Sequence, residues 1–378
     1  RPSSNVYVML STIDATRERG LGDNPTAASF RRQLNDWSKI SSNIFVWDYT
    51  TQFTAYLSPF PMYDHYQGNI AFMHQHGVKG VFEHGSGHTL GDMSAYASYV
   101  QAKSLWNPEV DPIEVENDFL EGYYGLAAKS IKKYLNQLLN ARNTSRSTLD
   151  IYGNPILSRR GYLGPEKMTM YKDLVDDGRK AVTGDPKLLS RVNLIALGLE
   201  YASLEQAKAY GEHPLGFLSK KDANQWMVNP NWMKRIDLFL DSALRGGAIE
   251  LAEVNGSLEQ YRKQWLTLLD KPYLPSLLQG VHPFFKPLFL QDFPANGKIT
   301  LNDGLSGTID YNYNWLLFDG KDVEIIFPFS RETQPAQVHL NFLLDPAHYL
   351  FLPDEVKVES SNDNISYVRI GTHKIDSS

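Results

Sequence analysis

Three short apolar runs, each containing a carboxylate near its end, constrain the fold of this chain more than any other feature. The runs are NVYVMLSTID at 5–14, NIFVWDYTTQF at 43–53 and GVKGVFEHGSGH at 77–88. Their β-branched and aromatic residues are typical of buried strands, and the segments between them have helical spacing. The alternation of strand and helix predicts a parallel sheet whose carboxyl ends meet at one edge.

Each predicted strand delivers one acidic residue to that edge, namely Asp14, Asp48 and Glu83. Carboxylates at the carboxyl ends of parallel strands are candidates for acid–base catalysis or for accepting sugar hydroxyls. An Asp that caps the following turn is the alternative interpretation of Asp48. The aromatic neighbours Trp47 and Tyr49 favour a functional role, so we predict Asp14, Asp48 and Glu83 as the catalytic residues.

Charged neighbours give Asp14 two possible roles. Arg17 and Arg19 follow it in IDATRERG, and opposite charges nearby would keep its carboxylate ionised. An arginine fork could also hold a substrate carboxylate with two hydrogen bonds. A solvated loop with internal salt bridges explains the same residues equally well.

Two histidines and several glycines follow Glu83. An acid beside an imidazole could tune protonation near neutral pH, and glycines allow a tight loop against a ligand. We predict no metal site, because Glu83 and His84 would point to opposite sides of a continuing strand. The predicted substrate-binding residues are Arg17, Trp47, Tyr49, Phe53, His84 and His88. The aromatic segment that follows the predicted strand at 44–47 forms either a stacking platform for a ligand or part of the core. It contains Phe53, Tyr56, Phe60, Tyr63 and Tyr66.

Composition excludes several classes of function. The formal net charge is −6 and no dense Lys or Arg run is present, so nucleic acid is an unexpected partner. The absence of cysteine excludes disulfides and thiolate chemistry. No segment reads as a membrane span, and no GxSxG, P-loop or GxGxxG pattern follows a strand. The 21 Tyr and 7 Trp are consistent with sugar handling or with a large aromatic core.

The chain reads as three successive regions. Residues 1–106 are predicted as βα units, 107–280 as an α-helical domain, and 281–378 as a β-sandwich of which we expect this sequence to contain only part. Three βα units cannot close an eight-stranded barrel, so a barrel would need strands outside this sequence. Helices are predicted at 26–40, 68–76, 93–105, 115–139, 187–209 and 232–246, and late strands at 298–301, 315–318, 323–329, 338–343, 356–359 and 367–370.

A family resemblance covers residues 5–139. The combination of WDY, PFP, GVKGVFE, LWNP and YYG resembles a bacterial domain-of-unknown-function family of TIM-barrel glycoside hydrolases, common in Bacteroidetes. Its members resemble α-glucuronidases and hexosaminidases. The resemblance implies the C-terminal part of a (β/α)8 barrel and general-base roles for Asp14 and Asp48. It also implies that the general acid comes from an earlier strand, outside this chain.

The C-terminal segment is similar to discoidin-like, galactose-binding-type sandwiches appended to bacterial glycosidases. Such modules bind glycans through loops and often hold a structural calcium, which is the one inorganic ion that the resemblance implies. The matching opening loop here contains Asp303, Gly304, Asp310 and Tyr311. The resemblance further implies a periplasmic or extracellular location.

These observations predict a glycoside hydrolase that acts on a polysaccharide or glycan. The alternative is a non-catalytic glycan-binding protein, in which the barrel is a scaffold and the sandwich carries the affinity. A helical protein that mediates contacts with partner chains is a third, weaker interpretation. The sugar, its linkage, the stereochemical outcome and the oligomeric state are not specified by the sequence.

Overall fold

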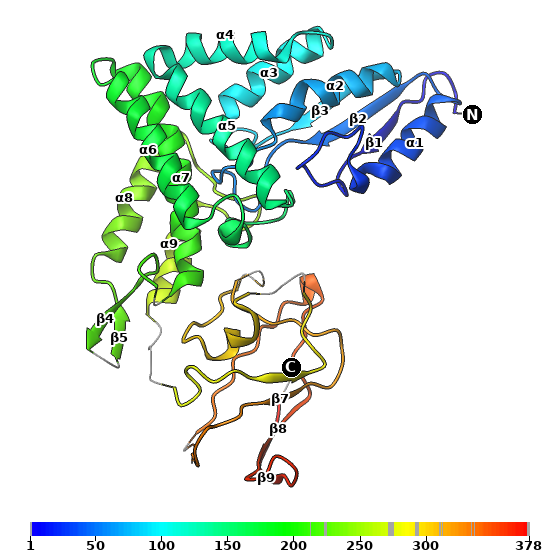
Figure 1. Cartoon of the computed structure of the whole chain (residues 1–378). Helices are drawn as coiled ribbons and strands as arrows, with labels where there is room; N and C mark the ends of the chain where they lie inside the picture. The colour runs from blue at the N-terminus through cyan, green and yellow to red at the C-terminus, as the bar shows by residue number, and fades with distance from the viewer. Residues whose placement is uncertain are drawn as a thin grey trace. The chain divides into compact units, whose positions relative to one another are not determined.

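A three-stranded parallel sheet with consecutive strand order begins the chain in the computed structural model (Figure 1). Its strands are β1 (Val8–Ser11), β2 (Ile44–Tyr49) and β3 (Val78–His84), joined through α1 (Ala28–Ser38) and α2 (Tyr66–Gln75). All five were expected from periodicity. The structure describes residues 2–211, 213–222, 225–270, 276–291, 295–309, 311, 313–333, 335 and 337–375.

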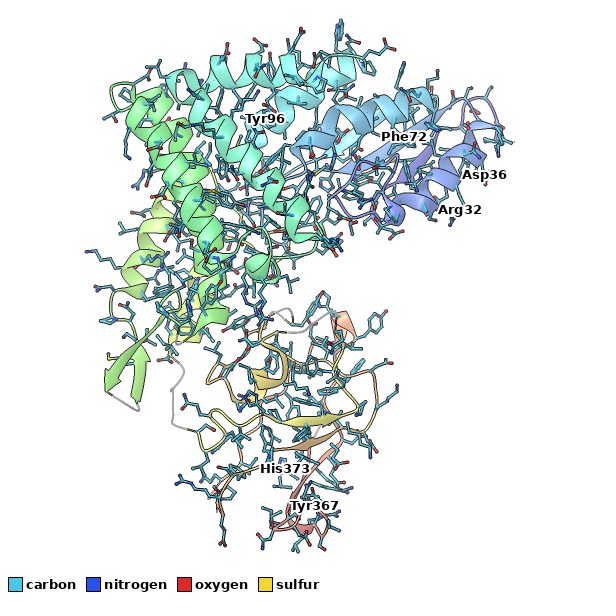
Figure 2. All side chains as sticks on the ribbon, in the orientation of Figure 1. Arg32, Asp36, Phe72, Tyr96, Tyr367 and His373 are labelled. Carbon is cyan, nitrogen blue, oxygen red and sulfur yellow. The ribbon has the colours of Figure 1, made fainter. Side chains whose placement is uncertain are left out.

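The two faces of this sheet differ sharply. One face packs on α1 and α2 and forms a closed core with Leu10, Val46, Leu34, Ile70 and Met73. Outward residues of α1, such as Arg32 and Asp36, are exposed (Figure 2). The opposite face carries large apolar side chains that remain accessible: Tyr7 is 62%, Met9 57%, Trp47 36% and Phe82 50% exposed. Helices therefore cover only one side of this parallel sheet.

Gly80 allows the strands to pack closely on the uncovered face. It pairs with Phe45 in the β2–β3 register, and a Cβ atom at Gly80 would lie 2.3 Å from the Phe45 ring. The Phe45 ring therefore occupies the space that any other residue at position 80 would fill.

In the part of the chain that the structure describes, seven α-helices follow the sheet. Their bounds are α3 (Ser94–Trp106), α4 (Pro112–Tyr124), α5 (Ala128–Ser145), α6 (Pro165–Ala181), α7 (Pro186–Tyr210), α8 (Trp232–Arg245) and α9 (Leu258–Leu269). The predicted single helix at 115–139 is wrong, because Gly125 has φ 52° and ends α4 in a left-handed conformation. Among the described residues no helix is long and apolar enough to cross a membrane.

The chain divides into two compact units. The first consists of Arg1–Lys208 with Asn229–Leu266, and the second of Ala209–Val228 with Thr267–Ser378. In the first unit, the loop after β2 shares one hydrophobic core with helices α3 to α7, and Tyr96 of α3 lies inside it. The sheet and the helical region of this unit are thus one packed body.

The second unit contains short antiparallel pairs. They are β4 (Leu218–Asp222) with β5 (Gln225–Val228), β6 (Phe284–Lys286) with β7 (Glu324–Ile326), and β8 (Glu355–Ser360) with β9 (Val368–Lys374). The expected strands at 323–329, 356–359 and 367–370 are confirmed at least in part by β7, β8 and β9. The mixed α/β character of the chain is confirmed; the sheets of the described residues include no closed barrel, and the sandwich stays a prediction.

Three other predicted strands of this unit are wrong. Residues 298–301 lie in a 3₁₀ helix (Gly297–Asn302), because the Thr300 hydroxyl donates to Gly297 O at 2.8 Å and accepts from Asn296 N–H at 3.0 Å. Among the described residues, 315–318 pair with another segment through Leu290 N–H to Leu317 O at 2.8 Å, while Phe318 O accepts from Gly320 N–H in a local turn, which is too little for a ladder. Residues 338–342 are exposed, Leu343 is half-buried, and the segment has no strand partner among the described residues.

Candidate functional site

The carboxyl ends of the three parallel strands, with the residues that follow them, form the edge that we call the rim. In the β2–β3 register Asp48 lies directly opposite Glu83, so both side chains leave the sheet on the same face. Thr12, just after β1, completes this group through its hydrogen bond to Asp48. The rim therefore joins residues of β2 and β3 with one residue that follows β1.

Asp48 is buried at the centre of this group, with 1% of its surface exposed. One of its oxygens, Oδ1, accepts hydrogen bonds from the Thr12 hydroxyl and from the Tyr49 N–H at 2.9 Å. The guanidinium of Arg17 lies 3.6 Å from the same oxygen. In this conformation Asp48 does not face solvent, and its contacts hold Thr12, Tyr49 and Arg17 together.

Arg17 is also buried, and its donors are used within the protein. Its Nε donates to Tyr49 O at 2.8 Å, and its Nη2 donates to both the backbone and side-chain oxygens of Thr12 at 3.0 Å. Its Nη1 donates to Ala15 O. A guanidinium placed in this way can hold Asp48 and the loop after β1, but it does not reach a substrate in solvent.

Glu83 differs from Asp48 in exposure and in its partners. It is only partly buried, and its carboxylate makes no hydrogen bond or ion pair within the described part of the chain. Loss of solvent contact raises its pKa well above the ordinary value, and the Asp48 carboxylate raises it further. The Arg17 guanidinium acts in the opposite direction. The shift favours the neutral carboxylic acid of Glu83 more than in a solvated glutamate, which is the direction that a proton donor requires.

Asp14 is not placed with the other two carboxylates. The chain turns immediately after β1, with the Ala15 N–H bonded to Thr12 O at 2.9 Å, and Asp14 is exposed on that turn. The strand alternation that would have put Asp14 on the face of Leu10 ends at this turn. Thr12, which sequence analysis did not select, makes the contact with Asp48 instead.

The aromatic residues of the rim lie on the other face of the sheet. Trp47 and Tyr49 are nearly parallel, with ring centroids 6.0 Å apart and an interplanar angle of 14°. The Trp47 Nε1–H donates to His84 Nδ1 at 3.2 Å, and Phe82 packs edge-on against Trp47. Trp47, Phe82 and His84 remain partly accessible, whereas Tyr49 is buried. The partly exposed rings can stack on a ligand, and the buried Tyr49 packs against Trp47 and His84.

Phe53 and His88 complete the predicted binding residues. Phe53 is 2% exposed and its ring centroid lies 4.6 Å from that of His84, so it supports the histidine from inside. His88 is exposed beside Gly87, which has φ 65°. The structure thus places His84 in the aromatic group and His88 on the outer part of its loop.

The remaining aromatic residues of the loop after β2 belong to the core, which was one of the two open interpretations. They surround Asp92, which accepts hydrogen bonds from the Tyr63 hydroxyl and from the Phe60 N–H at 2.9 Å. Burial raises the pKa of Asp92 to about 7, while these two hydrogen bonds lower it. The core members are Tyr56, Phe60, Tyr63 and Tyr66.

Two segments of the helical region also reach the rim, and sequence analysis did not predict them. The Phe53 N–H donates to Ile151 O at 2.7 Å, and the Phe53 O accepts from the Glu253 N–H at 2.7 Å. The Tyr56 N–H donates to Leu251 O at 2.8 Å. Backbone pairing over such sequence separations leaves no local signal; the only local hint is the aromatic, glycine-containing run IYG at 151–153.

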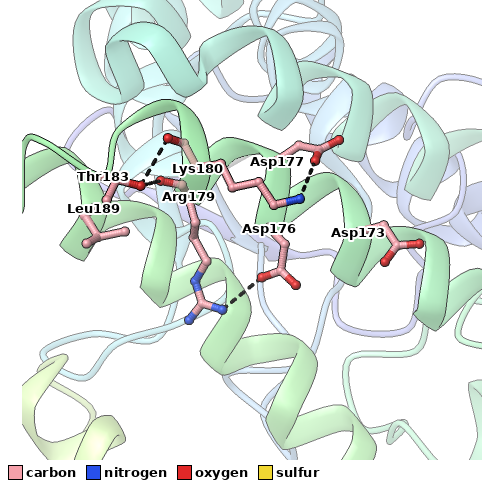
Figure 3. Close-up of a pocket in the computed structure, with 7 residues that line it drawn as sticks. All are labelled: Asp173, Asp176, Asp177, Arg179, Lys180, Thr183 and Leu189. Atoms are coloured by element: carbon pink, nitrogen blue, oxygen red, sulfur yellow. Dashed lines mark hydrogen bonds and ion pairs between the residues drawn. The ribbon is translucent and has the colours of Figure 1, made fainter.

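A hollow of about 420 Å³ on α6 and the start of α7 is not part of this site (Figure 3). Its charges pair with one another along the helix, Arg179 with Asp176 at 3.0 Å and Lys180 with Asp177 at 3.1 Å. Such i, i+3 pairs are typical of a solvated helix surface.

Candidate metal ligands lie at the rim and in the opening loop of the expected sandwich. Within the described ranges, no group of three or more His, Cys, Asp or Glu residues could hold a metal ion. Asp303 accepts from Leu305 N–H at 2.9 Å and from the Asn296 amide at 2.8 Å, so N–H donors occupy its oxygens. Asp310 lies outside the described residues. The described residues of this loop do not fit the expected calcium, which stays a prediction.

Comparison with known proteins adds one finding about the N-terminal part. Residues 1–136 match the model of a family described as Domain of unknown function (DUF4838). No curated protein and no solved structure matches the chain. The DUF4838 match spans the sheet, α1 to α4 and the first half of α5, and so contains Asp48, Glu83 and Arg17. It confirms the expected resemblance to a domain-of-unknown-function family, while the relation to glycoside hydrolases stays a prediction.

Proposed function

We propose that this protein is a glycoside hydrolase in which Glu83 donates the proton to the leaving oxygen. The observation that carries the proposal is the state of Glu83, a partly exposed carboxyl of raised pKa beside the buried Asp48–Arg17 pair. Glycoside hydrolysis requires a carboxylic acid that is still protonated near neutral pH. Trp47 and Phe82 are accessible on the opposite face of the sheet from Glu83, where they supply rings for stacking a sugar unit other than the one that Glu83 protonates.

This assignment changes the roles expected from sequence. Glu83 takes the part of the general acid, which the family resemblance places outside the chain. Asp48 becomes a positioning residue, because it is buried and its charge helps to keep Glu83 protonated. Asp14, exposed after β1, is available for a ligand contact.

The barrel remains part of the proposal. Support comes from the consecutive parallel order β1-β2-β3 and from the uncovered apolar face, because parallel sheets are normally covered on both faces. Further parallel strands would cover Tyr7, Met9 and Phe82 and would enclose the rim. The galactose-binding-like sandwich, a bound glycan and a periplasmic or extracellular location are proposed with it, from the resemblance alone.

A non-catalytic glycan-binding protein is the second candidate, and a specific observation favours it. Hydrolysis by either stereochemical course uses two carboxylates. Asp48, which lies opposite Glu83 in the β2–β3 register, is buried, and Asp14 lies apart on a turn. Neither of these two acids therefore offers Glu83 the accessible second carboxylate that hydrolysis needs.

Hydrolysis of a panel of 4-nitrophenyl glycosides and oligosaccharides by the full chain tests the proposal. Glu83→Gln should lower kcat/KM by about 10²–10⁴, the usual contribution of a general acid. Asp48→Asn should lower it less and shift the pH profile, and Glu121→Gln, on the exposed face of α4, should leave it unchanged. Binding without turnover on every substrate would select the second candidate.

A further inference from the structure

A row of aromatic rings leads from the rim into the helical region. His84 packs on Phe53 with ring centroids 4.6 Å apart, and Phe53 packs on Tyr152 at 6.2 Å. Phe53 is buried, whereas Tyr152 is 47% exposed. Tyr152 therefore offers an accessible ring at the outer end of a row whose inner end is at β3.

Backbone hydrogen bonds hold the segments of Tyr152 and Glu253 to one residue, Phe53. The N–H of Phe53 bonds to Ile151, and its carbonyl bonds to Glu253, both at 2.7 Å. The Gln52 side chain donates to Asp150 O at 3.2 Å, next to the same segment. Tyr152 and Glu253 thus belong to segments that are both held by Phe53.

The carboxylate of Glu253 has no partner of its own. It is exposed and makes no hydrogen bond or ion pair with any residue that the structure describes. Burial raises the pKa of Tyr152, and the nearby charge of Glu253 is the second cause. Burial followed by the charges of Glu253 and Glu250 likewise raises the pKa of Tyr56 to about 12. An unneutralised acid therefore lies close to an accessible ring.

An accessible ring beside a free carboxylate suits a polyhydroxylated ligand. The C–H face of a sugar packs on an aromatic ring, and its hydroxyl groups donate to carboxylate oxygens. We infer that Tyr152 and Glu253 form a second saccharide subsite. It binds one sugar unit of an oligosaccharide while the reacting unit of the same oligosaccharide lies at the rim. This inference rests on the proposed function and makes an oligosaccharide, rather than a monosaccharide glycoside, the ligand.

Binding and hydrolysis by the full chain test the subsite. The probes are cellohexaose, xylohexaose, chitohexaose and hexagalacturonate for calorimetric binding, and 4-nitrophenyl monosaccharides for turnover. With the hexasaccharide that binds, Tyr152→Ala should weaken affinity about tenfold and Glu253→Gln by a similar factor. Tyr152→Phe should retain the affinity, because the ring remains.

Two exposed residues elsewhere provide controls. Trp106→Ala, at a residue 92% exposed at the end of α3, and Glu259→Gln, at an exposed acid of α9, should change neither readout. Turnover of a monosaccharide glycoside should be the same in Tyr152→Ala as in the wild type, since that substrate does not reach the subsite.

The outcomes separate this inference from the proposed function. Hexasaccharide binding that weakens in Tyr152→Ala without any turnover would support the subsite and remove the hydrolase. Turnover or binding that is unchanged in both Tyr152→Ala and Glu253→Gln would overturn the subsite and leave the hydrolase standing. No binding and no turnover by the wild type on every probe would overturn both.

Discussion

Asp48 and Glu83 show how two neighbouring carboxyls acquire different roles from their surroundings. Both lie at the same level of adjacent strands, yet Asp48 has Thr12, Tyr49 and Arg17 as partners while Glu83 has none among the described residues. Hydrogen bonds and a cation stabilise a carboxylate, whereas burial without partners stabilises the neutral acid. The partners, more than the strand positions, therefore separate the two roles.

Removal of the Asp48 carboxylate should destabilise the first unit strongly. Asp48→Ala leaves the buried Arg17 guanidinium without its counter-charge, and such changes cost about 3–5 kcal/mol. Asp36→Ala removes an exposed acid that pairs with Lys39 at the C-cap of α1 and should cost less than about 1 kcal/mol. Urea unfolding measures both. Equal losses would show that the Asp48–Arg17 pair is not a structural centre.

Asp92 should make the free energy of unfolding fall as pH rises. Its pKa is about 7 in the folded protein and 3.8 as its ordinary value, so between these pH values the folded state keeps a proton that the unfolded state has released. The proton on Asp92 therefore adds to the free energy of unfolding. This stabilisation is fully present below pH 4 and is lost by pH 7, and it is on the order of 4 kcal/mol at 1.36 kcal/mol per pKa unit.

Urea titrations at several pH values check this dependence. Asp92→Asn should flatten the pH profile, because the amide oxygen can still accept from Tyr63 and Phe60 but does not titrate. Glu83→Gln removes a second carboxyl that titrates with the same sign and should be measured alongside. A profile that keeps its slope in Asp92→Asn would contradict the assignment.

At the scale of elements, two glycines of one helix have opposite requirements. Gly125 ends α4 with φ 52°, and a Cβ there would lie 2.8 Å from Leu188. Gly122 is exposed inside α4, and a Cβ there would meet nothing within 4 Å. The sequence pattern at 115–139 does not distinguish these glycines, which is why one helix was expected in place of two.

Alanine substitutions at these two positions should therefore have opposite signs. Gly122→Ala should stabilise by about 0.5–1 kcal/mol, since alanine is the better helix former. Gly125→Ala should destabilise by at least about 1 kcal/mol, because of the left-handed backbone and the contact with Leu188. Thermal unfolding compared with the wild type decides the signs, and destabilisation by both would argue against the assigned end of α4.

The sheet is the second element with a testable asymmetry. Phe30 of α1 is 4% exposed in the covered core, whereas Phe82 of β3 is 50% exposed on the other face. Phe30→Ala should cost about 3–5 kcal/mol, as for other core phenylalanines. Phe82→Ala loses mainly its edge-on contact with Trp47 and should cost about 1 kcal/mol. Similar losses in urea unfolding would mean that both faces are covered.

At the scale of the whole molecule, the sequence predicts local features well and distant contacts poorly. The helical period of residues 26–40 and the apolar runs of β2 and β3 are local, so these elements and the resemblance to a domain-of-unknown-function family could be predicted. The position of Asp14 could not, since it depends on a turn closed by Ala15 and Thr12. The contacts of Phe53 with Ile151 and Glu253 join segments about 100 and 200 positions away in the sequence. Local hydrophobic periodicity therefore cannot predict them.

The protonation state of Glu83 is the property on which the account depends. Carboxyl ¹³C shifts of the full chain, labelled in glutamate, can be followed from pH 3 to pH 9, and the difference from Glu83→Gln identifies the resonance. We expect its apparent pKa well above 4.5 and a lower value in Asp48→Asn, where the neighbouring charge is removed. An apparent pKa at or below 4.5 in the wild type would contradict the account.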